Sequence, residues 1–126
     1  MMRFILSSTE QKIMELLWKN QRWMSGAEFW EYFNSNGQSC KRQTINTYLF
    51  RMAQKGLLVK NEKKYMYVYT KEEFDEKKAK EVLNTLYEGS FKNFLFALTG
   101  NQKINSNEAA ELKEYLDKFD KERDKL

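Results

Sequence analysis

The side chains best suited to chemistry in this sequence are polar and cationic, and they gather in residues 41–55. Glutamine and asparagine pair with the edge of adenine, arginine pairs with guanine, and threonine contacts a thymine methyl group or a phosphate. A helical period of 3.6 residues would place these side chains together, opposite an apolar stripe. An ordinary helix whose polar face meets water would share this pattern, so the neighbouring elements must decide between the two. The candidate base-reading residues are Gln43, Thr44, Asn46, Thr47 and Arg51.

Cations near the same segment are candidate phosphate ligands. Contacts to phosphates position a protein on a duplex, whereas contacts to base edges specify the sequence. Residues 1–70 contain 11 Lys and Arg against 5 Asp and Glu, a net charge of +6, whereas residues 71–126 contain 11 against 13, a net charge of −2. The positive excess therefore lies in the half that holds the candidate base readers, although a solvated basic surface would give the same balance. The candidate phosphate ligands are Lys41, Arg42, Lys55, Lys63 and Lys64.

The polar residues can be presented together only if their segment is a helix. Ile45, Leu49 and Met52 give this helix an apolar stripe. Gly56 ends it, because glycine enters the left-handed conformation at little cost. Phe50 falls on the outward side, where it can contact base methyl groups or pack under the neighbouring hairpin, and the sequence leaves both alternatives open.

Two short runs after this helix predict a β-hairpin. Residues 57–60 and 65–70 are the expected strands, and the second run alternates with period two. Residues 61–64 form a polar tip that carries Lys63 and Lys64. A polar-faced helix followed by a basic-tipped hairpin is typical of a winged helix, a fold that commonly binds DNA.

Two features near the reading helix can each be interpreted in two ways. Tyr65, Tyr67 and Tyr69 share one strand face, which can stack on single-stranded bases but more often packs against a helix. Cys40 lies at the start of the helix beside two cations. A helix N-terminus and neighbouring cations favour a reactive thiolate, so redox control is one interpretation and a small packing residue is the other.

Two helices are expected before the reading helix. The first covers residues 8–19, and Ser7 with Glu10 has the spacing of a capping box. The second begins after Ser25 and has the same spacing to Glu28. Residues 22–24 are too short for a helix and predict an edge strand of the wing sheet.

Residues 71–126 predict three helices and no sheet. The first, residues 71–87, is polar along much of its length, so we expect it to pack poorly against the winged domain. A helical set of this size would be marginal alone, and burial against a second copy would stabilise it. A monomer whose helices fold back on the first half is the alternative. The candidate dimerisation residues are Leu83, Leu86, Phe91, Phe94, Leu95, Leu98, Leu112, Leu116 and Phe119.

The composition argues against catalysis, metal binding and membrane insertion. The chain has no histidine and one cysteine, so it lacks the usual general base and a soft-metal ligand set. It has no glycine-rich phosphate loop, and we expect no cofactor and no enzymatic activity. Neither a signal peptide nor a membrane span is apparent, and the single cysteine fits a reducing cytoplasm.

With these elements placed, the chain resembles the penicillinase-repressor family, which includes the methicillin-resistance regulators. The resemblance covers about Leu6 to Leu116, and the order and spacing of its motifs are specific although no single motif is unique. The matching residues are Leu6-Ser7, Glu10, Met14 and Leu17-Trp18 in the first helix, Thr44-Ile45, Thr47, Leu49, Arg51, Met52 and Lys55-Gly56-Leu57-Leu58 in the reading helix and its exit, Tyr67-Val68-Tyr69-Thr70 in the wing, and Gly89-Ser90-Phe91 with the Asn105–Leu116 helix in the dimer region.

The resemblance implies a homodimeric repressor that binds palindromic operators. Many family members are relieved by a membrane sensor-protease that cuts between Asn and Phe in the helix corresponding to residues 91–99. The pair here is Ala97-Leu98, which does not match that cut site. A copper-responsive branch carries a C-terminal cysteine cluster, which this chain lacks.

The sequence therefore predicts a mainly α fold with a small antiparallel β wing. A winged helix-turn-helix DNA-binding domain spans residues 1–70, and a helical dimerisation domain spans residues 71–126. A winged helix that binds another protein and no DNA is the alternative function. The basic excess and the two-lysine tip favour the repressor.

Overall fold

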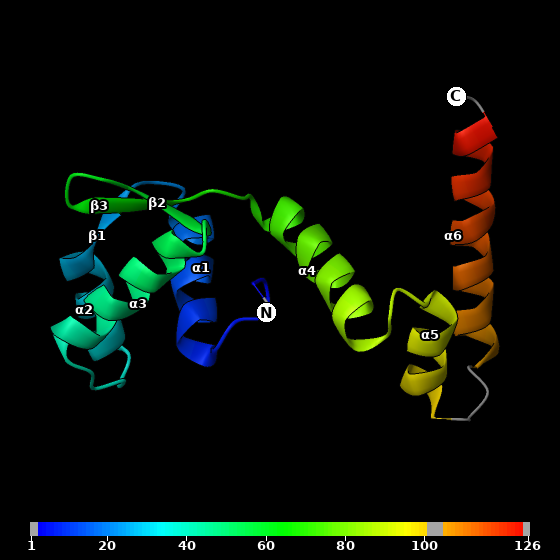
Figure 1. Cartoon of the computed structure of the whole chain (residues 1–126), viewed down its shortest axis with the longest axis horizontal. Coiled ribbons are helices and arrows are strands. Elements are labelled where there is room, and N and C mark those ends of the chain that lie inside the picture. Colours follow the sequence, from blue (N-terminus) through cyan, green and yellow to red (C-terminus); the bar gives the residue numbers. More distant parts are fainter. Residues whose placement is uncertain (1–2, 101–104, 125–126) are drawn as a thin grey trace.

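The computed structural model describes residues 3–100 and 105–124, with side chains described through residue 118. Its order of elements confirms the predicted mainly α fold with an antiparallel wing (Figure 1). The elements are α1 (Ser8–Asn20), β1 (Met24–Ser25), α2 (Gly26–Ser35), α3 (Arg42–Gln54), β2 (Leu58–Asn61), β3 (Lys64–Tyr67), α4 (Lys71–Leu86), α5 (Phe91–Thr99) and α6 (Ser106–Asp124).

The wing is a three-stranded antiparallel sheet in the order β1-β3-β2. The predicted edge strand is present, shifted to Met24–Ser25. The prediction of a four-residue tip was wrong, because Asn61 and Lys64 pair across the strands and leave a two-residue turn. Glu62 opens this turn with a φ of 59°, a conformation that tight hairpin turns require.

Three helices begin with a complete capping box. Ser7 and Ser25 accept hydrogen bonds from the backbone N–H of Glu10 and Glu28, whose carboxylates accept from the two serine N–H groups. Both boxes were predicted. Thr70 and Glu73 form a third box at the start of α4, so the chain leaves β3 after Tyr67 and does not continue as a strand to Thr70.

A single hydrophobic core joins α1, α2, α3 and the sheet. α3 contributes Ile45, Leu49 and Met52, which are fully buried as predicted. α3 ends at Gln54, and Gly56 follows with a φ of 77°. The remaining core side chains that are largely or fully buried are Phe4, Ile13, Met14, Leu16, Leu17, Met24, Phe29, Phe33, Leu57, Leu58, Tyr65 and Phe74.

The expectation that α4 packs poorly against the winged domain was wrong for its first half. Phe74 is only 1% exposed and lies in the core of that domain. Its ring meets Phe4 and Trp18 edge to face, with centroids 5.5 Å and 5.3 Å away. A single aromatic residue in an otherwise polar stretch is enough to fix the start of α4, which average polarity does not reveal.

The second half of the chain is far more exposed. Figure 1 shows α4 leading away from the winged domain toward α5 and α6. Leu86 and Leu98 are 56% and 70% exposed, and the described side chains of α6 are exposed except for Leu112, which is half-buried. Phe94 packs edge to face on Tyr87, with centroids 5.3 Å apart. No helix in residues 3–100 or 105–124 is long and apolar enough to cross a membrane.

The capping carboxylates predict that the fold is labile in acid. Burial raises the pKa of Glu10, but hydrogen bonds from Ser7 and Lys55 outweigh it and leave the pKa below its ordinary 4.5. The backbone N–H groups of Ser25 and Thr70 likewise lower the pKa of Glu28 and Glu73. Because these folded-state pKa values are depressed, their stabilisation is complete well above pH 4.5 and is lost as the pH falls through them.

We therefore expect the free energy of unfolding to change little between pH 7 and about 5.5 and to fall below pH 4.5. Urea titrations followed by circular dichroism at several pH values measure this. Glu10→Gln keeps an oxygen that can accept from the Ser7 N–H but cannot titrate, so its acid slope should be shallower than that of the wild type. Identical slopes for the two proteins would contradict the assignment.

Candidate nucleic-acid interface

The candidate surface is built on the polar side of α3. The five predicted base readers are all exposed on this helix: Gln43, Thr44, Asn46, Thr47 and Arg51. Their presentation follows from the buried stripe, because a helix that inserts one face into a core must turn the other face outward.

Two of these five side chains also contact the protein. The hydroxyl of Thr47 donates a hydrogen bond to the carbonyl oxygen of Gln43, at 2.9 Å. The amide of Asn46 lies against the start of α2, where a Cβ added to Gly26 would stand 2.6 Å from its Oδ1. Gly26 therefore makes room for Asn46 at the contact between the two helices.

The start of α3 is unusually positive. Lys41 is its N-cap residue and makes no side-chain capping hydrogen bond, and the first turn contains no acidic residue. Arg42 follows as the first helical residue. Cations at a helix N-terminus oppose the helix dipole, so this end is electrostatically unfavourable alone and would be relieved by a bound anion.

A groove of about 550 Å³ runs between α3, the start of α2 and the wing. Phe50 is 59% exposed and forms an apolar part of it, so this ring does not pack under the wing. The groove combines an exposed aromatic ring, an amide and three cations, a mixture suited to a nucleic-acid backbone and its sugars. The lining residues are Ser25, Gly26, Ala27, Arg42, Asn46, Phe50, Lys60, Lys63 and Tyr65.

Lys60 was missed by the sequence reasoning. It pairs with Tyr65 across the strands, and its Nζ lies 5.6 Å from the centroid of the Tyr65 ring. The alternation of side chains along β2 could have identified Lys60. Leu58 is buried, and Lys60, two residues later, lies on the same side of the sheet.

The predicted phosphate ligands are not equivalent. Lys41, Arg42, Lys63 and Lys64 are exposed, and Lys63 lies in the groove. Lys55 is half-buried, and its Nζ lies 3.2 Å from Oε2 of Glu10. Lys55 therefore has a partner inside the fold, which makes it the weakest of the five candidates.

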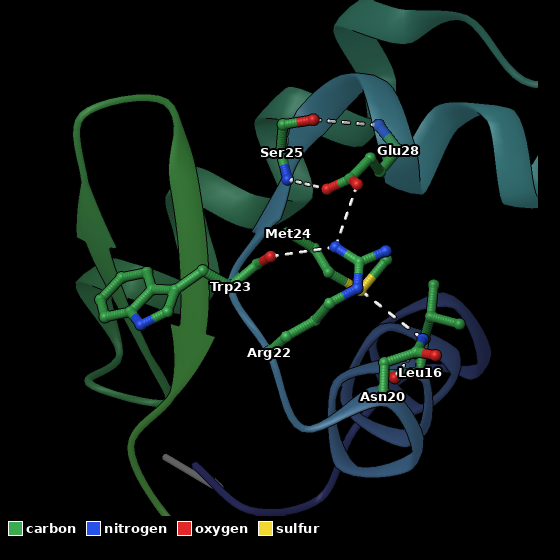
Figure 2. A network of polar contacts seen from close by, with 7 residues as sticks. All are labelled: Leu16, Asn20, Arg22, Trp23, Met24, Ser25 and Glu28. Atoms are coloured by element: carbon green, nitrogen blue, oxygen red, sulfur yellow. Dashed lines mark hydrogen bonds and ion pairs between the residues drawn. The ribbon is translucent and has the colours of Figure 1, made fainter.

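A network of polar contacts holds β1 and the start of α2 beside the groove (Figure 2). Arg22 donates to the carbonyl oxygen of Trp23 at 3.1 Å and to Glu28 at 3.0 Å, while Glu28 accepts from the N–H of Ser25 at 2.7 Å. Asn20 donates to the carbonyl oxygen of Leu16, at 2.9 Å, and to the sulfur of Met24. The network thus connects the end of α1 to β1, and the Glu28 carboxylate is already bound by Arg22 and the Ser25 N–H.

For the tyrosines of the wing and for Cys40, the structure favours a packing role over base stacking and redox control. Tyr65 is in the core, and Tyr67 and Tyr69 pack against it from partly buried positions. Cys40 also packs against the core, and its carbonyl oxygen accepts a hydrogen bond from the indole of Trp30 at 3.0 Å.

Comparison with known proteins agrees with this architecture. The family model described as penicillinase repressor matches residues 6–118. The penicillinase repressor of Bacillus licheniformis is similar to this chain, with 27% identity over 116 residues and 89% of each chain covered.

The basic surface predicts a strong salt dependence of binding to duplex DNA. Lys41, Arg42, Lys63 and Lys64, counted in both copies of the dimer that the sequence predicts, would neutralise about six to eight phosphates, which gives a log–log slope of roughly −5 to −7. Replacing Lys63 and Lys64 together with Ala should reduce the size of that slope by about 3 and weaken binding to every sequence alike.

Fluorescence anisotropy across a range of salt concentrations measures the slope. Lys71→Ala with Lys80→Ala is the matched control, because it removes two exposed cations from α4. A wild-type slope near zero, or equal slopes for the two double variants, would exclude this surface.

Proposed function

The chain belongs to the penicillinase repressor family, whose members are DNA-binding transcriptional repressors, and from this premise we propose that it is a homodimer that reads palindromic operators. α3 enters the major groove of each half-site, and the wing and the start of α3 bind the flanking phosphates. The observation that carries this proposal is the groove between α3, α2 and the wing, where Asn46, one of the five candidate base readers, lies on one surface with the cations Arg42, Lys60 and Lys63.

Base reading is assigned to the exposed side of α3. Gln43, Thr44 and Arg51 present hydrogen-bonding groups away from the core. Asn46 and Thr47 are also exposed, but Asn46 lies against α2 and Thr47 bonds to the backbone of α3. Amide and guanidinium groups distinguish base pairs in the major groove, where each pair has its own pattern of donors and acceptors.

Dimerisation is supported by the apolar surface that one copy leaves uncovered. Phe91 and Leu116 are 49% and 45% exposed, and Leu98 is more exposed still. A groove of about 440 Å³ between α4 and α5, with Val82, Leu83, Phe91 and Phe94 among its lining residues, adds to this surface. Exposed apolar surface on this scale is typical of an interface. Phe119 lies beyond the described side chains, and Leu95 and Phe94 are half-buried.

A symmetric dimer explains why the operator should be palindromic. The commonest dimers have a two-fold axis, which presents two copies of α3 in opposite directions to two half-sites. The proposal includes no proteolytic relief, because Ala97-Leu98 stands at the place of the family's Asn–Phe cut site.

The base-reading assignment predicts a loss of specificity on truncation. Replacing a true reader among Gln43, Thr44, Asn46, Thr47 and Arg51 with Ala should cost about 1–3 kcal/mol on a duplex selected by the wild type and much less on random duplex. Asn84→Ala, an exposed amide on α4, is the control for Asn46→Ala. If all five variants weaken selected and random duplex equally, the reading surface lies elsewhere. A wild type that binds no duplex would favour a protein partner.

The dimer assignment predicts a soluble monomer on disruption of α6. Leu112→Asp with Leu116→Asp would bury carboxylates in the interface and should weaken dimerisation about 100-fold or more. Asn107→Asp with Ala110→Asp adds the same charge on the opposite side of the helix and should leave the dimer intact. Sedimentation equilibrium measures both proteins, and a wild type that is monomeric at micromolar concentration refutes the assignment.

A further inference from the structure

Residues 3 and 4 form a short strap that joins two distant elements. The Nε of Arg3 donates a hydrogen bond to the carbonyl oxygen of Lys55, immediately after α3. Its guanidinium group also contacts the hydroxyl of Tyr69 at 3.4 Å and covers Gly56 so closely that a Cβ there would clash. Arg3 therefore attaches the strap to the end of the reading helix, where a cation also complements the helix dipole.

The next residue attaches the strap to α4. The backbone N–H of Phe4 donates to Oε2 of Glu81 at 2.9 Å. The Phe4 ring is almost fully buried and packs edge to face on Tyr69 and Phe74, with centroids 5.6 Å and 5.5 Å away. Two consecutive residues thus connect the end of α3 with the start and the third turn of α4.

The two attachments on α4 determine its direction. Phe74 and Glu81 are seven residues apart, so they lie on one side of the helix and about 10 Å apart along its axis. Contact at Phe74 alone would leave α4 free to pivot. The Nζ of Lys77 also lies 5.1 Å from the centroid of the Tyr69 ring, but a long lysine side chain is flexible, so the hydrogen bond at Glu81 is the contact that restrains the tilt. Oε1 of Glu81 is buried and has no hydrogen-bond partner among the described residues, so the carboxylate is held by the strap at the cost of part of its hydration.

A small change in the tilt of α4 would produce a large displacement of the reading helices along the DNA. α4 has 16 residues and is about 24 Å long, so a tilt of about 10° displaces its far end by about 4 Å. Successive base pairs are about 3.4 Å apart. An error of that size in each subunit, directed along the operator, would therefore change the separation of the two reading helices by up to about two base pairs.

From this geometry we propose that Phe4 and Glu81 are positioning residues that set the half-site spacing accepted by the repressor. The proposal rests on the homodimer described above. Neither residue is itself a candidate base reader, so they would act through the direction of α4 and through the anchoring of Arg3 at the end of α3.

The first test uses duplexes that the wild type selects from a random library, with the centre then lengthened or shortened by one and two base pairs. We expect wild-type affinity to fall about tenfold or more with altered spacing. Phe4→Ala and Glu81→Ala should flatten this profile while affinity for a single half-site stays within about twofold. Glu81→Gln keeps an acceptor for the Phe4 N–H and should restore the profile. Glu76→Ala removes an exposed carboxylate from the same helix and serves as the control.

Unchanged spacing profiles in Phe4→Ala and Glu81→Ala overturn the positioning role, as does an equal loss on single and paired half-sites. A wild type that selects no duplex overturns the repressor proposal itself, and the spacing role with it. A second measurement needs no DNA: a spin label at Glu31→Cys, an exposed position of α2, in a Cys40→Ser background. The label-to-label distance in the dimer should be narrowly distributed in the wild type and broad in Phe4→Ala. Equal widths overturn the proposal.

Discussion

Burial of one stripe of α3 is the interaction on which the rest of this structure depends. Ile45, Leu49 and Met52 are fully buried, and each contributes about 1.5–3 kcal/mol relative to an exposed side chain. α3 packs against α2 and β2, so its rotation about its own axis is fixed. The direction of the polar side chains follows without further interactions, since a helix held by one face has only one way to present the other.

The start of α3 breaks a local rule that α1, α2 and α4 follow. α1, α2 and α4 each begin with a complete capping box and an acidic first turn, whereas α3 begins with two cations and no side-chain cap. Natural proteins tend to violate such rules where function requires it. The cost in helix stability is small beside the buried stripe, and the result is a helix end that attracts anions.

Residue patterns predicted the elements and the exposed side of α3, because these depend on local periodicity and capping. A few neighbouring residues are enough to recognise the capping pair Ser7 and Glu10, the apolar stripe that begins at Ile45 and the helix end at Gly56. The pairing of Lys55 with Glu10 and the groove position of Lys60 depend on contacts between residues distant in the sequence. Phe74 and Phe4 were missed because neither belongs to a periodic stripe: Phe74 is a single apolar residue in a polar stretch, and Phe4 lies in a short apolar run before the first helix.

Contacts along α4 would couple the orientation of the winged domain to that of the C-terminal helices. The start and the third turn of α4 are held by the aromatic contacts of Phe74 and by the hydrogen bond to Glu81, all of which lie within one subunit. The far end carries apolar side chains that a single subunit leaves exposed, so its order would depend on a second copy. In the proposed dimer, contact between the two copies would set how the far ends meet, and the strap would set the direction in which α4 leaves each winged domain. Operator spacing would therefore be a property of both contacts together, because a change in either one moves the two reading helices apart.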